Sequence, residues 1–351
     1  MSTALRSLVE SGTKLWLDSI DPDQVPANID LGITGATSNP IIIADLMQTD
    51  RFDHAIGQRI EAGDNDEQLA WNMTDQMVRW AQSRFEPVWE QTSGNDGYVS
   101  FELDPLLEDA KLAPPHEQRV AKYVEEGKRW AEGHRNRLIK VPATAAGLEA
   151  LEDLAAAGIS LNVTLIFTQR QYDLAREAIW RGRQQFGQLE SFKSVYSIFV
   201  SRVDVYTQRH VPQLSQATQG QVGIVNAKRL WRSNQEFWAS KHLPLQQEIV
   251  FASTGAKLPG QAPDCYVVAL AGSDIQTNPP ATNAEIERMS KQYVKTIDQM
   301  PEASLLKEID QEVDHQHLEQ VLMTEGVAKF ADPFKQLLLT LGQKRQALSA
   351  V

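Results

Sequence analysis

Three ionisable residues stand inside otherwise apolar runs of this chain, and Lys140 is the most informative of them. It lies in residues 138–144, which read Leu-Ile-Lys-Val-Pro-Ala-Thr and are typical of a short buried strand. A lysine is rarely buried without a partner or a function. Loss of water lowers the pKa of an ammonium group and yields a nucleophilic amine, which can form a Schiff base with a ketone. The simpler interpretation, a lysine that extends from a strand end into water, is favoured by the heptapeptide alone.

Two carboxylates favour the Schiff-base interpretation of Lys140 over the one in which the lysine extends into water. Asp18 and Glu102 also interrupt apolar runs, and three buried ionisable groups would each be costly unless they paired with one another. A buried amine between two carboxylates is what imine chemistry requires. One carboxylate moves protons while water leaves, and the other takes a proton from a hydroxyl as a carbon–carbon bond breaks. Carboxylates in unlike surroundings can hold different pKa values and so divide acid and base work.

The elements that must position these groups alternate regularly along the chain. Strand-like runs occupy residues 15–18, 32–38, 98–103, 138–141, 161–167, 195–200, 248–253 and 265–270, and helical patterns follow most of them, for example at 148–157, 169–184 and 222–240. Eight strands alternating with helices predict an α/β fold, a (β/α)8 TIM barrel. A doubly wound open sheet is the alternative, but no glycine-rich phosphate fingerprint follows an early strand.

We expect a single domain over residues 1–351. The barrel would span about residues 15–281, with a helical insertion at 44–96 after the second strand and a helical C-terminal extension at about 282–351. No low-complexity linker and no internal repeat divides the chain. The extension is expected to cover the barrel, although it could instead recruit a partner protein.

Composition limits the partners. A content of 42% hydrophobic and 23% charged residues is that of a globular protein, and a net charge of −12 argues against nucleic acid but leaves small anionic substrates open. The single cysteine, Cys265, excludes an internal disulfide and suits a reducing cytosol.

No secretory or membrane-spanning run is evident, so we expect a cytoplasmic protein with no membrane partner. The histidines lack metal-ligand spacing, and no metal is expected.

In a barrel, polar residues at the C-terminal strand ends line the active mouth. Such residues come from seven of the predicted strands and would converge on one pocket: Asp18, Thr37, Asn39, Glu102, Lys140, Asn162, Thr164, Ser197, Arg202 and Ser253. Several have an ordinary structural explanation, since Asn39 precedes a proline, Thr164 is β-branched and Ser253 could cap a helix.

Two cations could bind an anion near this pocket. Arg202 could hold a phosphate through two parallel hydrogen bonds, or it could pair with Asp204, and the sequence supports both interpretations equally. Lys257 is a second candidate, close to Ser253 in the sequence.

At this point the chain resembles the transaldolase family, in particular its longer-chain branch, over about residues 15–282. The motifs that carry the resemblance occur in the family's order. They are Trp16-Leu17-Asp18, the Gly-Ala-Thr-Ser-Asn-Pro of 35–40, residues 94–105, the lysine segment 139–144, residues 162–167 and 199–204, Asn226-Ala227-Lys228, and residues 251–254.

The resemblance implies roles for the catalytic residues. Lys140 would attack the C2 carbonyl of a ketose phosphate, sedoheptulose 7-phosphate or fructose 6-phosphate. Glu102 would move protons through a water held by Thr164. Asp18 would deprotonate the C4 hydroxyl as C3–C4 breaks. The dihydroxyacetone unit left on the lysine would pass to glyceraldehyde 3-phosphate or erythrose 4-phosphate, in the non-oxidative pentose phosphate pathway.

The resemblance also implies how the substrate is held. Asn39 and Asn162 would bind its hydroxyls, and Ser197, Arg202 and Ser253 would lie toward its phosphate. Thr37 and Lys257 complete the expected substrate-binding set. No cofactor is implied, because the imine itself accepts the electrons.

Two other functions stay open. One is a fructose-6-phosphate aldolase-like lyase that releases free dihydroxyacetone, although Glu102 favours transfer within the family. The other is a catalytically silent relative that only binds sugar phosphates.

The family patterns are altered at residues 19–23, 41–43 and 258–264, which shape the pocket rim. The identity of the preferred sugars therefore stays open too. A monomer and a homodimer both fit an acidic barrel surface.

Overall fold

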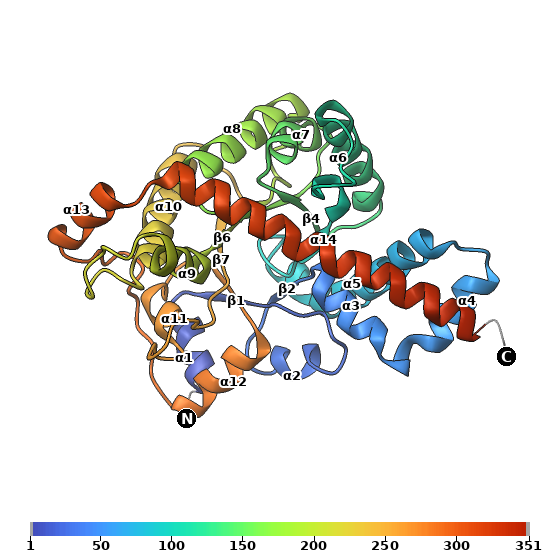
Figure 1. Ribbon diagram of the computed structural model, residues 1–351, viewed down its shortest axis with the longest axis horizontal. Helices are drawn as coiled ribbons and strands as arrows, with labels where there is room; N and C mark the ends of the chain where they lie inside the picture. Colours follow the sequence, from blue (N-terminus) through green and yellow to red (C-terminus); the bar gives the residue numbers. More distant parts are fainter. Residues whose placement is uncertain (1–2, 349–351) are drawn as a thin grey trace.

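A closed barrel of eight parallel strands forms the centre of the molecule (Figure 1). The computed structural model describes residues 3–348. The strands pair in chain order, and the last closes on the first. They are β1 (Lys14–Leu17), β2 (Gly35–Thr37), β3 (Val99–Glu102), β4 (Arg137–Pro142), β5 (Leu161–Ile166), β6 (Ser194–Phe199), β7 (Glu248–Ala252) and β8 (Ile275–Asn278). The predicted (β/α)8 barrel is confirmed.

The eighth strand was predicted in the wrong place. Residues 265–270 contain the helix α11 (Cys265–Ala269), which buries Tyr266 and Val267. A short apolar run does not by itself distinguish a buried helix from a buried strand. The actual strand β8 reads Ile-Gln-Thr-Asn, and its three polar residues are buried, so its sequence lacks the hydrophobic signal of a strand.

Helices surround the barrel. They are α1 (Ala4–Glu10), α2 (Val25–Ile29), α6 (His116–Ala131), α7 (Ala145–Ala156), α8 (Gln169–Phe186), α9 (Val200–His210), α10 (Val222–Ala239) and α12 (Pro280–Met289), with the 3-10 turn η2 (Pro105–Glu108). The three helices predicted from 148–157, 169–184 and 222–240 are confirmed as α7, α8 and α10.

The turn from β4 into α7 depends on a glycine. Thr144 begins the helix by accepting a hydrogen bond from the Gly147 backbone N–H at 3.1 Å. A Cβ atom on Gly147 would lie 2.0 Å from the Pro142 carbonyl oxygen, so no other residue fits. This tight turn fixes the end of the strand that carries Lys140.

The predicted insertion after β2 is helical as expected. It contains α3 (Pro40–Gln48), η1 (Asp50–Phe52), α4 (Asp53–Glu61) and α5 (Asp66–Gln91). A capping box formed by Asn65 and Gln68 begins α5, and its buried face packs on the barrel near β3.

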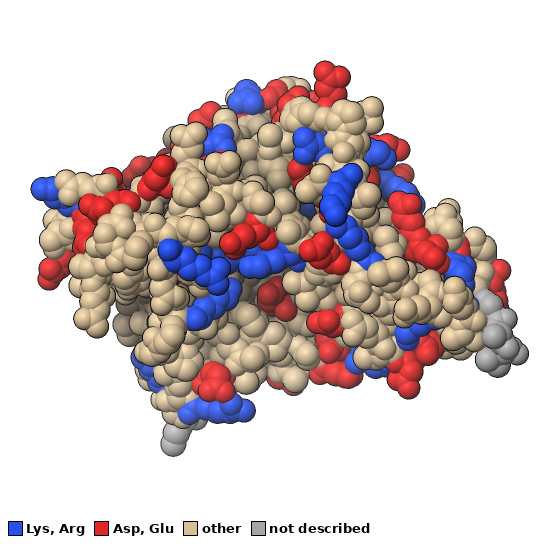
Figure 2. All heavy atoms as spheres, viewed as in Figure 1, with Lys and Arg blue, Asp and Glu red and all other residues tan. Residues whose placement is uncertain are grey.

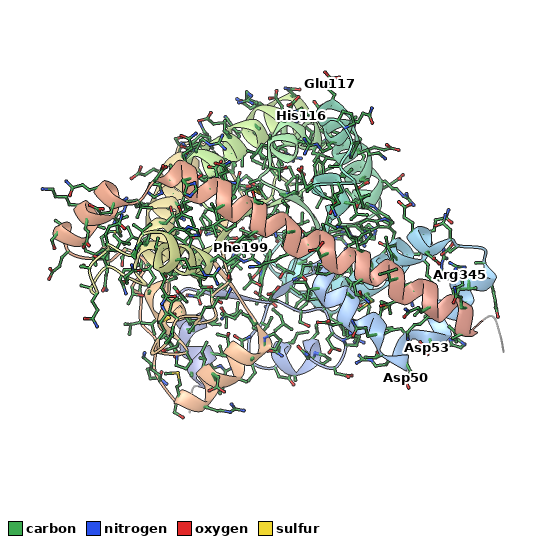
Figure 3. All side chains as sticks on the ribbon, viewed as in Figure 1. Asp50, Asp53, His116, Glu117, Phe199 and Arg345 are labelled. Atoms are coloured by element: carbon green, nitrogen blue, oxygen red, sulfur yellow. The ribbon has the colours of Figure 1, made fainter. Side chains whose placement is uncertain are left out.

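The C-terminal extension contains α13 (Ala303–Glu312) and the long helix α14 (His315–Leu348), which crosses one open end of the barrel (Figure 1). Along its course α14 contacts α9, η2, α3, α5 and α4. Its last turns are held by ion pairs of Lys344 with Asp53 and of Arg345 with Asp66, at the edge where Figure 3 labels Asp53 and Arg345. The extension therefore covers the barrel, as expected.

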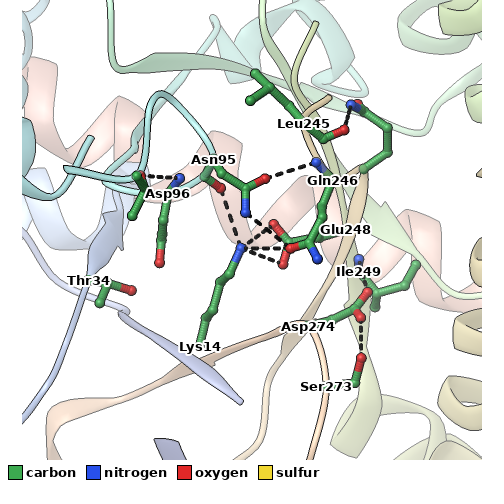
Figure 4. Close-up of polar contacts among 12 residues, drawn as sticks. Lys14, Thr34, Asn95, Asp96, Leu245, Gln246, Glu248, Ile249, Ser273 and Asp274 are labelled. Carbon is green, nitrogen blue, oxygen red and sulfur yellow. Dashed lines mark hydrogen bonds and ion pairs between the residues drawn. The ribbon is translucent and has the colours of Figure 1, made fainter. Parts of the chain in front are cut away.

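An ionic network closes the opposite end of the barrel, where the strands begin (Figure 4). Glu248 at the start of β7 lies 2.9 Å from the Lys14 Nζ, as drawn in Figure 4. Its carboxylate also lies 2.5 Å from the Nζ of the buried Lys193. Lys193 also donates to the backbone carbonyls of Asn95 and Gln246, at 2.9 and 2.7 Å. Burial alone would raise the pKa of Glu248, but the two ammonium groups hold it below its ordinary value. Sequence analysis did not identify this network.

Replacing Glu248 by glutamine is expected to lower the free energy of unfolding by about 3 kcal/mol, because it leaves the Lys193 ammonium buried without its counter-charge. Urea denaturation measures the change. Glu152→Gln is the control, since Glu152 pairs with the exposed Arg181 at 2.8 Å, and it should cost less than about 1 kcal/mol. Equal losses for the two variants would contradict a structural role for the network.

Candidate active site

Lys140 lies inside the barrel, at the end that α14 covers. The residue is 5% exposed, and its Nζ donates hydrogen bonds to Glu102 Oε2 at 2.9 Å and to the Ser38 carbonyl at 3.2 Å. Parallel pairing of β3 with β4 sets Glu102 directly beside Lys140. The interpretation in which this lysine extends into water is therefore wrong.

Asp18 follows β1 and faces the same space. Its carboxylate accepts a hydrogen bond from the Thr37 hydroxyl at 3.0 Å, and Thr37 lies 3.3 Å from the Thr277 hydroxyl on β8. Burial raises the pKa of Asp18, and the positive charge of Lys140 opposes this. Burial likewise raises the pKa of Glu102 against the same opposing charge. The two carboxyls differ in their partners, because one contacts an amine and the other a hydroxyl.

These groups surround a cavity of about 210 Å³. All of the predicted site residues except Glu102 and Asn162 line it, namely Asp18, Thr37, Asn39, Lys140, Thr164, Ser197, Arg202, Ser253 and Lys257. Glu102 lines a small adjoining cavity and reaches the main one through its contact with Lys140. The prediction that polar residues of several strands converge on one pocket is confirmed.

The two asparagines are engaged by the protein itself. The side-chain Oδ1 of Asn39 accepts from the backbone N–H groups of Ile41 and Ile42 at 3.0 and 3.1 Å, so Asn39 caps α3. Asn162 is fully buried, donates to Ser100 Oγ at 2.9 Å and accepts from Ser197 Oγ at 2.7 Å. Asn162 thus supports Ser197 from inside the barrel, and a direct role in binding a substrate hydroxyl stays a prediction.

Thr164 presents an unused polar group. Its hydroxyl is buried on the cavity wall and has no hydrogen-bond partner among the described residues. Buried polar groups are nearly always satisfied, so an unpaired one at a cavity calls for a bound partner. A water molecule or a substrate oxygen would satisfy it.

Arg202 provides two further unpaired groups. Its Nε and Nη1 atoms are buried without a hydrogen-bond partner in the described part of the chain, and its guanidinium lies 4.8 Å from the centre of the Phe199 ring. The alternative pairing with Asp204 is wrong, because that carboxylate accepts from the Tyr266 hydroxyl and the Gly223 N–H, both at 2.8 Å. A planar guanidinium with free N–H groups suits a phosphate.

Lys257 and Ser253 lie on the same side of the cavity. The Lys257 Nζ donates to Ser253 Oγ at 3.0 Å, and the Ser253 Oγ also lies 2.9 Å from Ser201 Oγ. Burial, together with the nearby charge of Arg202, lowers the pKa of Lys257 to about 8. Figure 2 shows Lys and Arg side chains gathered beside a hollow next to α14, although the chain as a whole is acidic. An anion bound here would relieve the repulsion between these cations.

Comparison with known proteins agrees with this geometry. A family model described as Transaldolase/Fructose-6-phosphate aldolase matches residues 15–341. The chain belongs to this family.

Relatives match over nearly the whole length. "Transaldolase" of Kocuria rhizophila is 31% identical over 100% of both chains, and "Transaldolase" of Thermobifida fusca is 30% identical over 99% of this chain and 100% of its own. "Transaldolase 2" of Streptomyces coelicolor is 30% identical over 96% of each chain. The resemblance to the transaldolase family is confirmed, and the match extends into the C-terminal extension.

The cavity of this transaldolase-family site is also lined by residues that were not predicted, among them Thr277 and Phe330. Thr277 lines the cavity from β8, which was predicted at other residues. Phe330 reaches the cavity from α14. No local signal could have shown this, because it depends on where the helix crosses the barrel.

Within residues 3–348, no group of three or more His, Cys, Asp or Glu side chains is arranged to hold a metal ion. None of the helices in this range is long and apolar enough to cross a membrane.

If Arg202 receives a phosphate, Arg202→Met should weaken the binding of inorganic phosphate by about tenfold or more, as expected for loss of a charge-assisted hydrogen bond. Isothermal titration calorimetry measures this affinity. Arg181→Met is the matched control, because Arg181 is exposed on α8 and its loss should leave the affinity unchanged. Equal affinity in all three proteins would place the anion elsewhere.

Proposed function

We propose that this protein is a transaldolase. It transfers a dihydroxyacetone unit from a ketose phosphate, sedoheptulose 7-phosphate or fructose 6-phosphate, to an aldose phosphate, glyceraldehyde 3-phosphate or erythrose 4-phosphate. Such a transferase works in the non-oxidative pentose phosphate pathway. One observation carries the proposal: a buried lysine amine 2.9 Å from Glu102, in a barrel mouth that also holds Asp18 and an unpaired arginine.

The first half of the reaction forms the imine. In its neutral form the Lys140 Nζ attacks the C2 carbonyl of the ketose, and the resulting carbinolamine loses its C2 oxygen as water. Glu102 would accept and return the protons of this step through a water held by the Thr164 hydroxyl. The raised pKa of Glu102 supports this role, because a carboxyl that binds a proton more readily is a better proton acceptor than an ordinary one.

The second half breaks and remakes a carbon–carbon bond. Asp18 takes the proton of the C4 hydroxyl, the C3–C4 electron pair moves into the imine, and the aldose phosphate leaves. The enamine that remains on Lys140 attacks the carbonyl carbon of the acceptor, and Asp18 returns its proton to the new hydroxyl. Hydrolysis then frees the ketose product. The imine itself receives the electrons, so no cofactor enters any step.

The remaining residues bind and orient the sugar. Thr37 holds Asp18 through its hydrogen bond, and Asn39 and Ser197 offer polar groups to hydroxyls along the cavity. Arg202, Lys257 and Ser253 would hold the phosphate. Fixing both ends of the substrate keeps C2 within reach of the amine, which is where positioning lowers the barrier.

We further propose that residues 1–351 act as one domain, of which 1–2 and 349–351 lie outside the described residues. Contacts of α14 with α3, α5 and α9 support this. A single cysteine, Cys265, supports a reducing cytoplasmic location. Assembly into a homodimer stays a prediction.

Transfer and simple release are separated by one assay. Fructose 6-phosphate is incubated with and without erythrose 4-phosphate, and sedoheptulose 7-phosphate and free dihydroxyacetone are quantified. We expect rapid formation of sedoheptulose 7-phosphate with the acceptor and little dihydroxyacetone without it. The Lys140→Ala variant, which lacks the reacting amine, is the negative control. Release without acceptor at a comparable rate would instead support the aldolase-like lyase, and no product from either mixture would support a silent binding protein.

A further inference from the structure

The helix α14 places an aromatic side chain directly against the reacting amine. Phe330 is 6% exposed, and its ring centre lies 5.4 Å from the Lys140 Nζ. The two groups that accept hydrogen bonds from this amine, Glu102 Oε2 and the Ser38 carbonyl, both belong to the barrel. Phe330 offers no donor or acceptor of that kind, so its contribution is shape and the exclusion of water.

Phe330 forms the wall between two spaces. On one side lies the main cavity with Lys140, Asp18 and Thr164. On the other lies a cavity of about 10 Å³ beside Glu102 and Asp104, which is at the lower limit of the room that one water needs. Removing the ring would join the two and open the reacting centre to more water.

The position of this wall is fixed by the packing of α14. Phe330 belongs to one apolar cluster with Phe199 and Val203, and Figure 3 labels Phe199 close to α9 and α14 near the middle of the molecule. One turn earlier on the same helix, a Cβ on Gly326 would lie 3.1 Å from the Leu165 side chain. The helix thus approaches β5 about as closely as side chains allow.

We propose that Phe330 is a positioning residue of the Schiff-base site, which keeps water from the enamine on Lys140 and so directs the dihydroxyacetone unit to an aldose acceptor. This inference rests on the proposed transaldolase function. It assigns the choice between transfer and release partly to the C-terminal extension, and not to the barrel alone.

The reaction that Phe330 suppresses needs water at two points. Water donates a proton to C3 of the enamine and becomes hydroxide, the C2–C3 π electrons form the new C–H bond, and an iminium ion remains. Water then adds to C2, the C2–N bond breaks with its electrons moving to nitrogen, and dihydroxyacetone departs from the regenerated lysine. The transfer cycle itself needs only the water that Thr164 and Glu102 would hold, so exclusion of further water favours transfer.

The test compares two phenylalanines of the same helix. Phe334 lies one turn after Phe330, is 3% exposed and packs on Trp71 with ring centres 5.0 Å apart, away from both cavities. In the presence of fructose 6-phosphate and erythrose 4-phosphate, the ratio of free dihydroxyacetone to sedoheptulose 7-phosphate is measured. Phe330→Ala should raise this ratio roughly tenfold and Phe330→Leu by less, because both open the wall to water. Phe334→Ala and Phe334→Leu should leave it unchanged.

The leucine variants keep most of the apolar volume, so their comparison decides the matter if an alanine variant does not fold. An unchanged ratio in the Phe330 variants, or an equal rise in the Phe334 variants, would overturn the inference. A wild-type protein that forms no sedoheptulose 7-phosphate would instead overturn the proposed function. The two failures are therefore distinguishable.

Discussion

The structure depends most on the burial of the Lys140 amine. Removing an ammonium group from water costs several kcal/mol unless a well-placed partner offsets it. Glu102 is that partner, and only because β3 and β4 pair in parallel with these two residues side by side. Closure of the barrel brings Asp18 and Thr164 to the same space from other strands, and α14 covers it. Each of these elements helps to shield the Lys140 amine from water while leaving it accessible to substrate.

The barrel buries a lysine beside a glutamate at both of its ends, and the two pairs differ in an instructive way. Lys193 donates to Glu248 and two backbone carbonyls, which uses all three N–H groups of an ammonium. Lys140 has two acceptors among the described residues, and unpaired atoms of Thr164 and Arg202 line the same cavity. A buried lysine whose three N–H groups all have acceptors stabilises the fold. A buried lysine with fewer acceptors, beside polar groups that lack partners, is suited to bind and react with a substrate.

Sequence reasoning succeeded where a local pattern and the physics of barrels agreed. Ionisable residues in apolar strands identified Lys140, Glu102 and Asp18, and the rule that active sites gather at C-terminal strand ends placed Thr37, Arg202 and Ser253 with them. It failed where the outcome depends on packing across the chain. Three of the four residues of strand β8 are polar although all four are buried, so an apolar helix was predicted as the strand in its place. Phe330 reaches the site from α14, a helix whose path no local motif records.

The central claim is that the Lys140 amine forms a covalent imine with a ketose phosphate. Borohydride reduction in the presence of fructose 6-phosphate, followed by peptide mass spectrometry, tests it most directly. The account predicts a stable adduct on Lys140 and none on Lys193, which is buried at the other end of the barrel. No adduct with either ketose phosphate, or an adduct on a different lysine, would contradict it.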